Sequence, residues 1–302
     1  MAVPVLFLFA LVFTTTSGVA PPPLDSWSIS GINSLKRSPL KPTNFRYRYL
    51  TRSGNCLLFK PDEVSIRIAA TNNVYERAIT VTCLTLSKIT QYMPREVFAN
   101  VSKSHGVGIF TLAETLSVYP ENADLVDRPE CFQTCEGVCN NTCTFDGRKY
   151  SEVAGLTNEI SLSNMESILC LPTDIYQGAE NILTHEFAHL VHMYMNDTWK
   201  DKIMAAYQKA KSNKLWRQHS YAMENEYEYF AVAAESFFHD IIRKDAKSTG
   251  GMNICKNQRI CSDEMKARQF LRRHDPGIFY CLSYAFTDDR PWRISGLKPC
   301  MR

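Results

Sequence analysis

Residues 185–189 read His-Glu-Phe-Ala-His, and this pentapeptide is the stretch that specifies a chemistry. Two histidines four residues apart on a helix project from the same side, one turn apart. That spacing suits two ligands of a single Zn²⁺, with the intervening Glu186 beside the ion. The flanking residues predict a helix in the core, because they are apolar almost all round: Ile182, Leu183, Phe187, Ala188, Leu190, Val191, Met193, Tyr194 and Met195.

The simplest alternative is an ordinary core helix whose neutral histidines bond to backbone. In that case one charged side chain and three imidazoles must find hydrogen-bond partners in an apolar setting. Burying such groups without partners costs free energy. His192 adds a third histidine on much the same face. Three ligands from consecutive turns of one helix converge poorly on a tetrahedral ion, so His192 is expected to pack beside the site. A metzincin is not expected, since His192 stands at the motif's glycine and Met195 at its last ligand.

A third ligand must come from another segment, and residues 221–231 are the best candidate. Asn225 there has the character of a helix N-cap, followed by acidic residues in the first turn. Glu228 falls at the third helical position, where it either closes a capping box with Asn225 or supplies an oxygen ligand. An apolar stripe supports the helix: Phe230, Ala233, Ala234, Phe237 and Ile241.

The two segments together resemble the zincin metallopeptidases that use a glutamate ligand, the gluzincins, and most closely the catalytic domain of anthrax-toxin lethal factor and its relatives. The resemblance rests on the pentapeptide followed by Tyr-Ala, Asn-Glu and Glu-Tyr-Phe-Ala within residues 221–231. It implies zinc on His185, His189 and Glu228. It further implies that Glu186 is the catalytic base and that the hydroxyl of Tyr221 stabilises the transition state.

One position departs from the family pattern. A second glutamate often follows the ligand by four residues, and here Val232 stands there. Glu235, on the same helix face as Glu228, is the candidate for the hydrogen bond to a zinc-binding histidine. His219 is the alternative to Tyr221 as hydrogen-bond donor. The implied fold is α+β and zincin-like: a small mixed sheet, the motif helix and a helical C-terminal half.

The N-terminal region predicts entry into the secretory pathway. Residues 1–20 carry no charge and contain a short apolar core, typical of a signal peptide. Residues 21–44 are expected to be a flexible segment, in which Lys36-Arg37 either marks a propeptide cleavage site or is a solvated basic pair. Residues 45–302 are expected to form a single catalytic domain. No later apolar run approaches eighteen residues, so no membrane anchor is expected.

Eleven cysteines predict disulfides in such a compartment. A cysteine-rich loop at 129–145 and a tail at 251–302 hold eight of them. Disulfides are favoured over metal binding in the loop, and the odd cysteine is either free or joins a second chain. As an alternative to joining a disulfide, Cys56 would bind the zinc ion as an inhibitory ligand. Three glycosylation acceptor patterns, at Asn100, Asn140 and Asn196, suit an extracellular glycoprotein.

Further elements are expected around the motif: strands at 45–50 and 106–112, helices at 74–92, 96–104 and 263–273, and an edge strand within 155–171. The net charge of only +3 indicates neither a nucleic-acid nor a membrane surface. The function expected is a secreted zinc endopeptidase acting on protein or peptide. The alternatives are an inert extracellular binding or structural protein on the same fold, and a zinc enzyme that cleaves another kind of amide.

Overall fold

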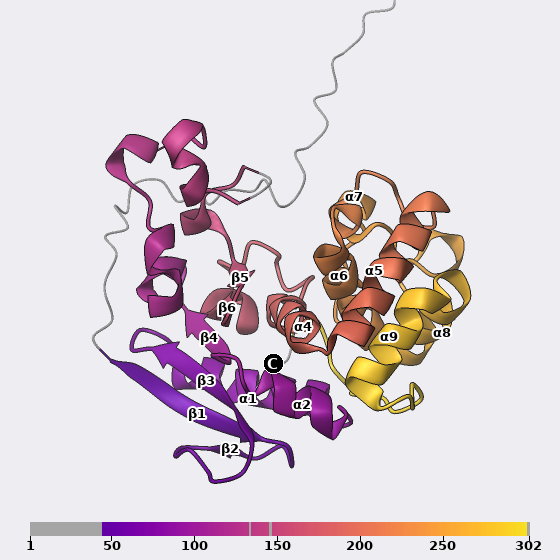
Figure 1. The fold of residues 1–302 in the computed structure, drawn as a ribbon, viewed down its shortest axis with the longest axis horizontal. Coiled ribbons are helices and arrows are strands. Elements are labelled where there is room, and N and C mark those ends of the chain that lie inside the picture. Colours follow the sequence, from indigo (N-terminus) through magenta and orange to yellow (C-terminus); the bar gives the residue numbers. More distant parts are fainter. Residues whose placement is uncertain (1–43, 133, 145–146, 301–302) are drawn as a thin grey trace, which may run out of the picture.

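The computed structural model describes residues 44–132, 134–144 and 147–300 (Figure 1). The expected signal peptide, and all but the last residue of the expected flexible segment, lie outside these residues. None of the helices that are described is long and apolar enough to cross a membrane.

The described N-terminal half forms a six-stranded mixed sheet in the order β2-β1-β3-β4-β6-β5. Antiparallel pairing joins β1 to β2 and β3, whereas β3, β4 and β6 run parallel. The edge strand β5 is antiparallel to β6. The strand bounds are β1 Phe45–Thr51, β2 Cys56–Leu57, β3 Ser65–Thr71, β4 Val107–Phe110, β5 Gly155–Thr157 and β6 Ser161–Asn164.

Helices lie beside the sheet and make up the C-terminal half. In Figure 1 the motif helix α4 lies between the sheet, with α1 and α2, and the group of helices α5 to α9. The α-helical bounds are α1 Glu76–Thr90, α2 Arg95–Val101, α3 Met165–Ile168, α4 Ile182–Tyr194, α5 Asp197–Ser212, α6 Glu226–Phe238, α7 Ala246–Thr249, α8 Glu264–His274 and α9 Pro276–Thr287. The α+β class, with its mixed sheet, motif helix and helical C-terminal half, is confirmed.

Short 3₁₀ helices fill the connections. Five of them, between β4 and β5, carry most of the chain that includes the cysteine-rich loop: η3 Leu116–Val118, η4 Pro120–Leu125, η5 Pro129–Cys131, η6 Gly137–Thr142 and η7 Tyr150–Glu152. Two more, η8 Tyr221–Met223 and η9 Lys256–Gln258, precede α6 and α8.

The sequence located the long elements and the edge strand, but not the shorter elements that follow that strand. The expected strand at 45–50 and helix at 74–92 correspond to β1 and α1. The expected edge strand within 155–171 is confirmed as β5, and the rest of this stretch adds the paired strand β6 and the short helix α3. Asn164 ends the strand run by capping α3, where its side chain accepts a hydrogen bond from the Ser167 amide.

Two apolar clusters hold these layers. The larger one joins α1, α4, α6 and α9 to one face of the sheet, and Phe187 of α4 and Phe230 of α6 are completely buried in it. The smaller one lies on the other sheet face, where Tyr119 and Leu162 pack together. Burial of α4 and α6 against each other fixes the relative position of their polar side chains.

All eleven cysteines lie in the described residues, and ten of them form disulfides: Cys56–Cys83, Cys131–Cys139, Cys135–Cys143, Cys170–Cys300 and Cys255–Cys261. The odd cysteine is Cys281 of α9, which is buried. Two alternatives are therefore wrong. Cys56 is bonded to Cys83 and cannot serve as an inhibitory zinc ligand, and the buried Cys281 thiol is not presented to a second chain.

Candidate metal centre

Helix α4 brings the two histidines of the pentapeptide to one site. The helix begins after Asn181, whose side chain accepts a hydrogen bond from the Thr184 amide. Every residue from Ile182 to His192 is buried. Three of the polar side chains on this buried helix, those of His185, Glu186 and His189, therefore need partners inside the protein.

Helix α6 supplies the partner of these histidines. Its N-cap is Asn225, whose side-chain oxygen accepts hydrogen bonds from the amides of Tyr227 and Glu228, both at 2.9 Å. The Glu228 carboxylate turns toward α4, where Oε2 lies 3.1 Å from Nε2 of His185. In this position Glu228 could contribute an oxygen to a metal site shared with the two histidines.

Three donor atoms converge at the distances that a tetrahedral ion requires. Nε2 of His185 lies 3.1 Å from Nε2 of His189, and Oε2 of Glu228 lies 3.1 and 3.5 Å from these two nitrogens. With zinc–ligand bonds near 2.0–2.1 Å, the edges of a coordination tetrahedron measure about 3.3 Å. Among the described residues, these three side chains are one of two sets that lie close enough together to hold a metal ion.

Glu235 determines which nitrogen of His185 faces the site. Its completely buried carboxylate lies 3.0 Å from Nδ1 of His185. A carboxylate there favours the tautomer with the proton on Nδ1, which leaves the Nε2 lone pair directed at His189 and Glu228. In that tautomer the imidazole nitrogen can join Nε2 of His189 and the Glu228 carboxylate in one donor set, and two imidazole nitrogens with one carboxylate oxygen fit a divalent metal.

The pKa values of these side chains reflect the same crowding. Burial alone would lower the pKa of His185, but its hydrogen bonds with Glu228 and Glu235 outweigh burial and raise the pKa well above its ordinary value. Burial acts to raise the pKa of Glu228, yet the charges and hydrogen bonds of His189 and His185 lower it.

Glu186 points into the adjoining cleft. Burial raises the pKa of its carboxyl, against the opposing influence of His189 and His185. The hydroxyl of Thr157 on β5 lies 2.7 Å from Oε2 of Glu186. The cleft, of about 330 Å³, is also lined by Arg148, Tyr150, Leu156, Met193, Tyr221 and Tyr227. The same cleft is therefore lined by Glu186 and by two of the three donor residues, His189 and Glu228.

Of the two expected hydrogen-bond donors, only Tyr221 lines this cleft. The centroid of its ring lies 6.3 Å from that of His185, and the Arg148 guanidinium lies 5.9 Å from the ring centre. His219 is not among the residues that line the cleft. Tyr227, which the sequence reasoning missed, also lines the cleft and is 45% exposed, so with Tyr150 and Tyr221 the cleft offers three phenols. Its position next to Glu228 was the available signal.

His192 packs beside the site, away from the three donor atoms. The centroid of its ring lies 4.7 Å from that of Tyr227 and 5.2 Å from that of Phe230. Burial lowers the pKa of His192 to about 3, so the ring is neutral. It forms part of the wall behind Tyr227.

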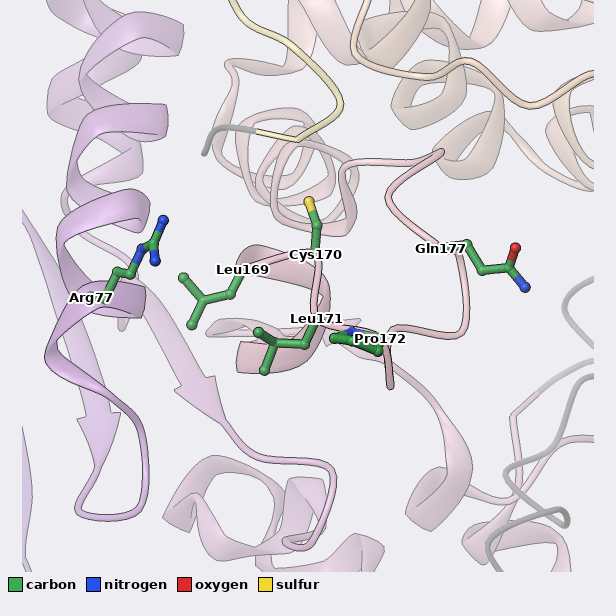
Figure 2. A pocket seen from close by; sticks show the side chains of 6 residues that line it. All are labelled: Arg77, Leu169, Cys170, Leu171, Pro172 and Gln177. Atoms are coloured by element: carbon green, nitrogen blue, oxygen red, sulfur yellow. The ribbon is translucent and has the colours of Figure 1, made fainter.

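A second cavity, of about 450 Å³, lies between α1 and the turn that follows α3 (Figure 2). Arg77 borders it on one side and Gln177 on the other, with residues 169–172 between them. Arg77 is the one charged group that lines it among the described residues, so this cavity does not offer the paired groups that the cleft at Glu186 contains.

Comparisons with known proteins identify no family for this chain. No family model and no curated protein match it. Among solved structures, a Pro-Pro endopeptidase from Paenibacillus alvei is similar with a TM-score of 0.45 and 17% sequence identity, over 72% of this chain and 95% of that chain. A likeness this low supports no argument about function. Any argument about function therefore depends on the site itself.

Proposed function

We propose that this protein is a secreted, zinc-dependent endopeptidase of the glutamate-ligand kind. His185, His189 and Glu228 are the metal ligands in this proposal, and Glu186 is the general base. The observation that carries it is the convergence of three donor atoms, 3.1–3.5 Å apart, next to a buried carboxylate that opens into a cleft. Two neutral imidazoles and one carboxylate are a donor set typical of catalytic zinc.

When bound, zinc supplies Lewis-acid chemistry, which polarises a carbonyl and lets water react near neutral pH. Glu186 then accepts a proton as the water attacks the peptide carbonyl, and the same carboxyl delivers that proton to the leaving nitrogen. A carboxyl whose pKa is raised by burial is suited to both transfers. In this proposal the phenol of Tyr221, which lines the same cleft, donates a hydrogen bond to the carbonyl oxygen as negative charge develops there.

The proposed extracellular location is supported by the cysteines. Five disulfides form within the described residues, and such bonds persist in oxidising compartments. Residues 1–20 serve as the signal peptide in this proposal. Expression of the full chain in secreting cells, followed by sequencing of the N-terminus of the exported protein, tests this part separately.

The deciding experiment combines metal analysis with digestion of a peptide library, with and without a chelator. We expect zinc at one equivalent per chain and cleavage that the chelator abolishes. Glu186→Gln should keep the zinc and lose cleavage, while Glu159→Gln, at an exposed glutamate that does not line the cleft, should change neither. Bound zinc without any cleavage would favour the inert scaffold, and full activity in Glu186→Gln would refute the mechanism.

A further inference from the structure

The edge strand β5 touches the proposed base, Glu186, at two positions. Gly155 and Thr157 are two residues apart on this strand, so they face the same side of the sheet. Leu156, between them, faces the other side and packs against the smaller core. The side that carries Gly155 and Thr157 faces α4, and both residues meet Glu186 there.

The hydroxyl of Thr157 lies within reach of two oxygens of the same residue. Its Oγ1 is 2.7 Å from Oε2 of the Glu186 carboxylate and 2.9 Å from the Glu186 backbone oxygen. A hydrogen bond to a carboxylate is stronger than one between neutral groups. Because one side-chain atom spans both ends of Glu186, it fixes the carboxylate relative to the backbone of the helix.

Gly155 provides the space on the other side. A Cβ atom at this position would lie 2.6 Å from Oε1 and 2.7 Å from Cγ of Glu186, closer than real contacts allow. It would also lie 2.8 Å from the backbone oxygen of Leu162 on the paired strand. The Glu186 side chain therefore packs directly against bare backbone, with the Thr157 hydroxyl holding its end.

We propose that Thr157 is a positioning residue for the catalytic carboxylate of Glu186, which sits in the space that Gly155 leaves open. This inference rests on the proposed function, because it assigns Thr157 a role in that reaction. A base transfers protons efficiently only when it is held in place, and a displacement of about 1 Å can cost a hundredfold in rate. Thr157 supplies this constraint from the sheet, outside the helix that carries the motif.

The test is Thr157→Val, which removes the hydroxyl and keeps the branched shape that suits a strand. We expect kcat to fall about ten- to a hundredfold, as for loss of one hydrogen bond to a charged group, while KM changes by less than about twofold. Zinc content and Tm should stay at their wild-type values. Thr157→Ser restores the hydroxyl and should recover kcat to within about threefold of wild type.

Thr82→Val is the matched control, because Thr82 is a buried threonine of α1 whose hydroxyl has no partner among the described residues. The same chemical change there should leave kcat unaltered.

A second experiment needs neither metal nor substrate. It follows the carbon-13 NMR signal of the Glu186 carboxyl in labelled protein, and the signal is assigned by its loss in Glu186→Gln. Thr157→Val should shift or broaden this signal, and Thr157→Ser and Thr82→Val should not.

The outcomes separate this inference from the proposed function. If Glu186→Gln is inactive but Thr157→Val keeps wild-type kcat, the inference is wrong and the function stands. The inference is also overturned if kcat falls equally in the valine and serine variants, or if the fall in kcat accompanies a lower Tm or zinc content. Either result would give Thr157 a purely structural role. Full activity in Glu186→Gln would refute both the proposed mechanism and the inference about Thr157, because Glu186 would then not be the base that Thr157 positions.

Discussion

The helix pair α4–α6 and the cysteine-rich loop, residues 129–144, both border the cleft, but different forces hold them. The helices are held by apolar burial, and their charged groups pair with one another, as His185 does with Glu235. The loop consists of short 3₁₀ turns closed by Cys131–Cys139 and Cys135–Cys143, each spanning eight residues. The three donor atoms thus lie on packed helices, while the covalently tied loop, in its described residues, reaches the cleft only through Thr144, next to Cys143.

This contrast is tested most strongly at Glu228. Glu228→Ala removes one of the three donor atoms and should abolish stable zinc binding, because two imidazoles alone cannot complete a catalytic zinc site. We expect the loss of affinity to exceed the ~100-fold that removal of an outer hydrogen bond costs. Dialysis against a graded metal buffer, followed by metal analysis, measures it. The control is Glu226→Ala on the first turn of the same helix, which should bind zinc normally.

Glu235→Gln addresses the packed network behind the ligands. The amide keeps the size of the side chain but lacks the charge that favours the Nδ1 proton of His185. Zinc affinity should fall about 10- to 100-fold, as expected when an outer partner of a ligand histidine is removed. Competition with a chromophoric chelator measures this value. Unchanged affinity would show that the 3.0 Å contact with His185 does not help to hold the metal.

Loss of a disulfide in the cysteine-rich loop should change local stability and leave zinc affinity unchanged. Replacing Cys131 and Cys139 together by serine removes the closure of a short loop, which is worth about 2–3 kcal/mol of local stability in the chain-entropy treatment. Zinc affinity should not change, because all three proposed ligands lie on α4 and α6. We expect faster amide hydrogen exchange confined to residues 129–144 and a higher KM for peptides. Loss of zinc in this variant would contradict the separation of the two regions.

The same division explains what the sequence could and could not predict. Helical spacing placed His185, Glu186 and His189, and capping by Asn225 placed the helix that carries Glu228, since both are local signals. Disulfide pairing could not be deduced, because spacing alone does not say which cysteines approach in space. Thr157 was missed for a similar reason. Its contact with Glu186 crosses from the sheet to a helix 29 residues later, and a lone threonine carries no motif.

His192 gives the smallest expected effect and tests whether packing alone accounts for the third histidine of α4. The ring is neutral, its Nδ1 has no partner among the described residues, and it contacts Tyr227 and Phe230. His192→Phe keeps a flat ring and removes a buried nitrogen that makes no hydrogen bond to the described residues. The free energy of unfolding should therefore change by less than about 1 kcal/mol. Zinc stoichiometry should remain at one per chain, whereas His189→Phe should lose the metal. Reduced zinc in His192→Phe would instead place this histidine among the groups that hold the ion.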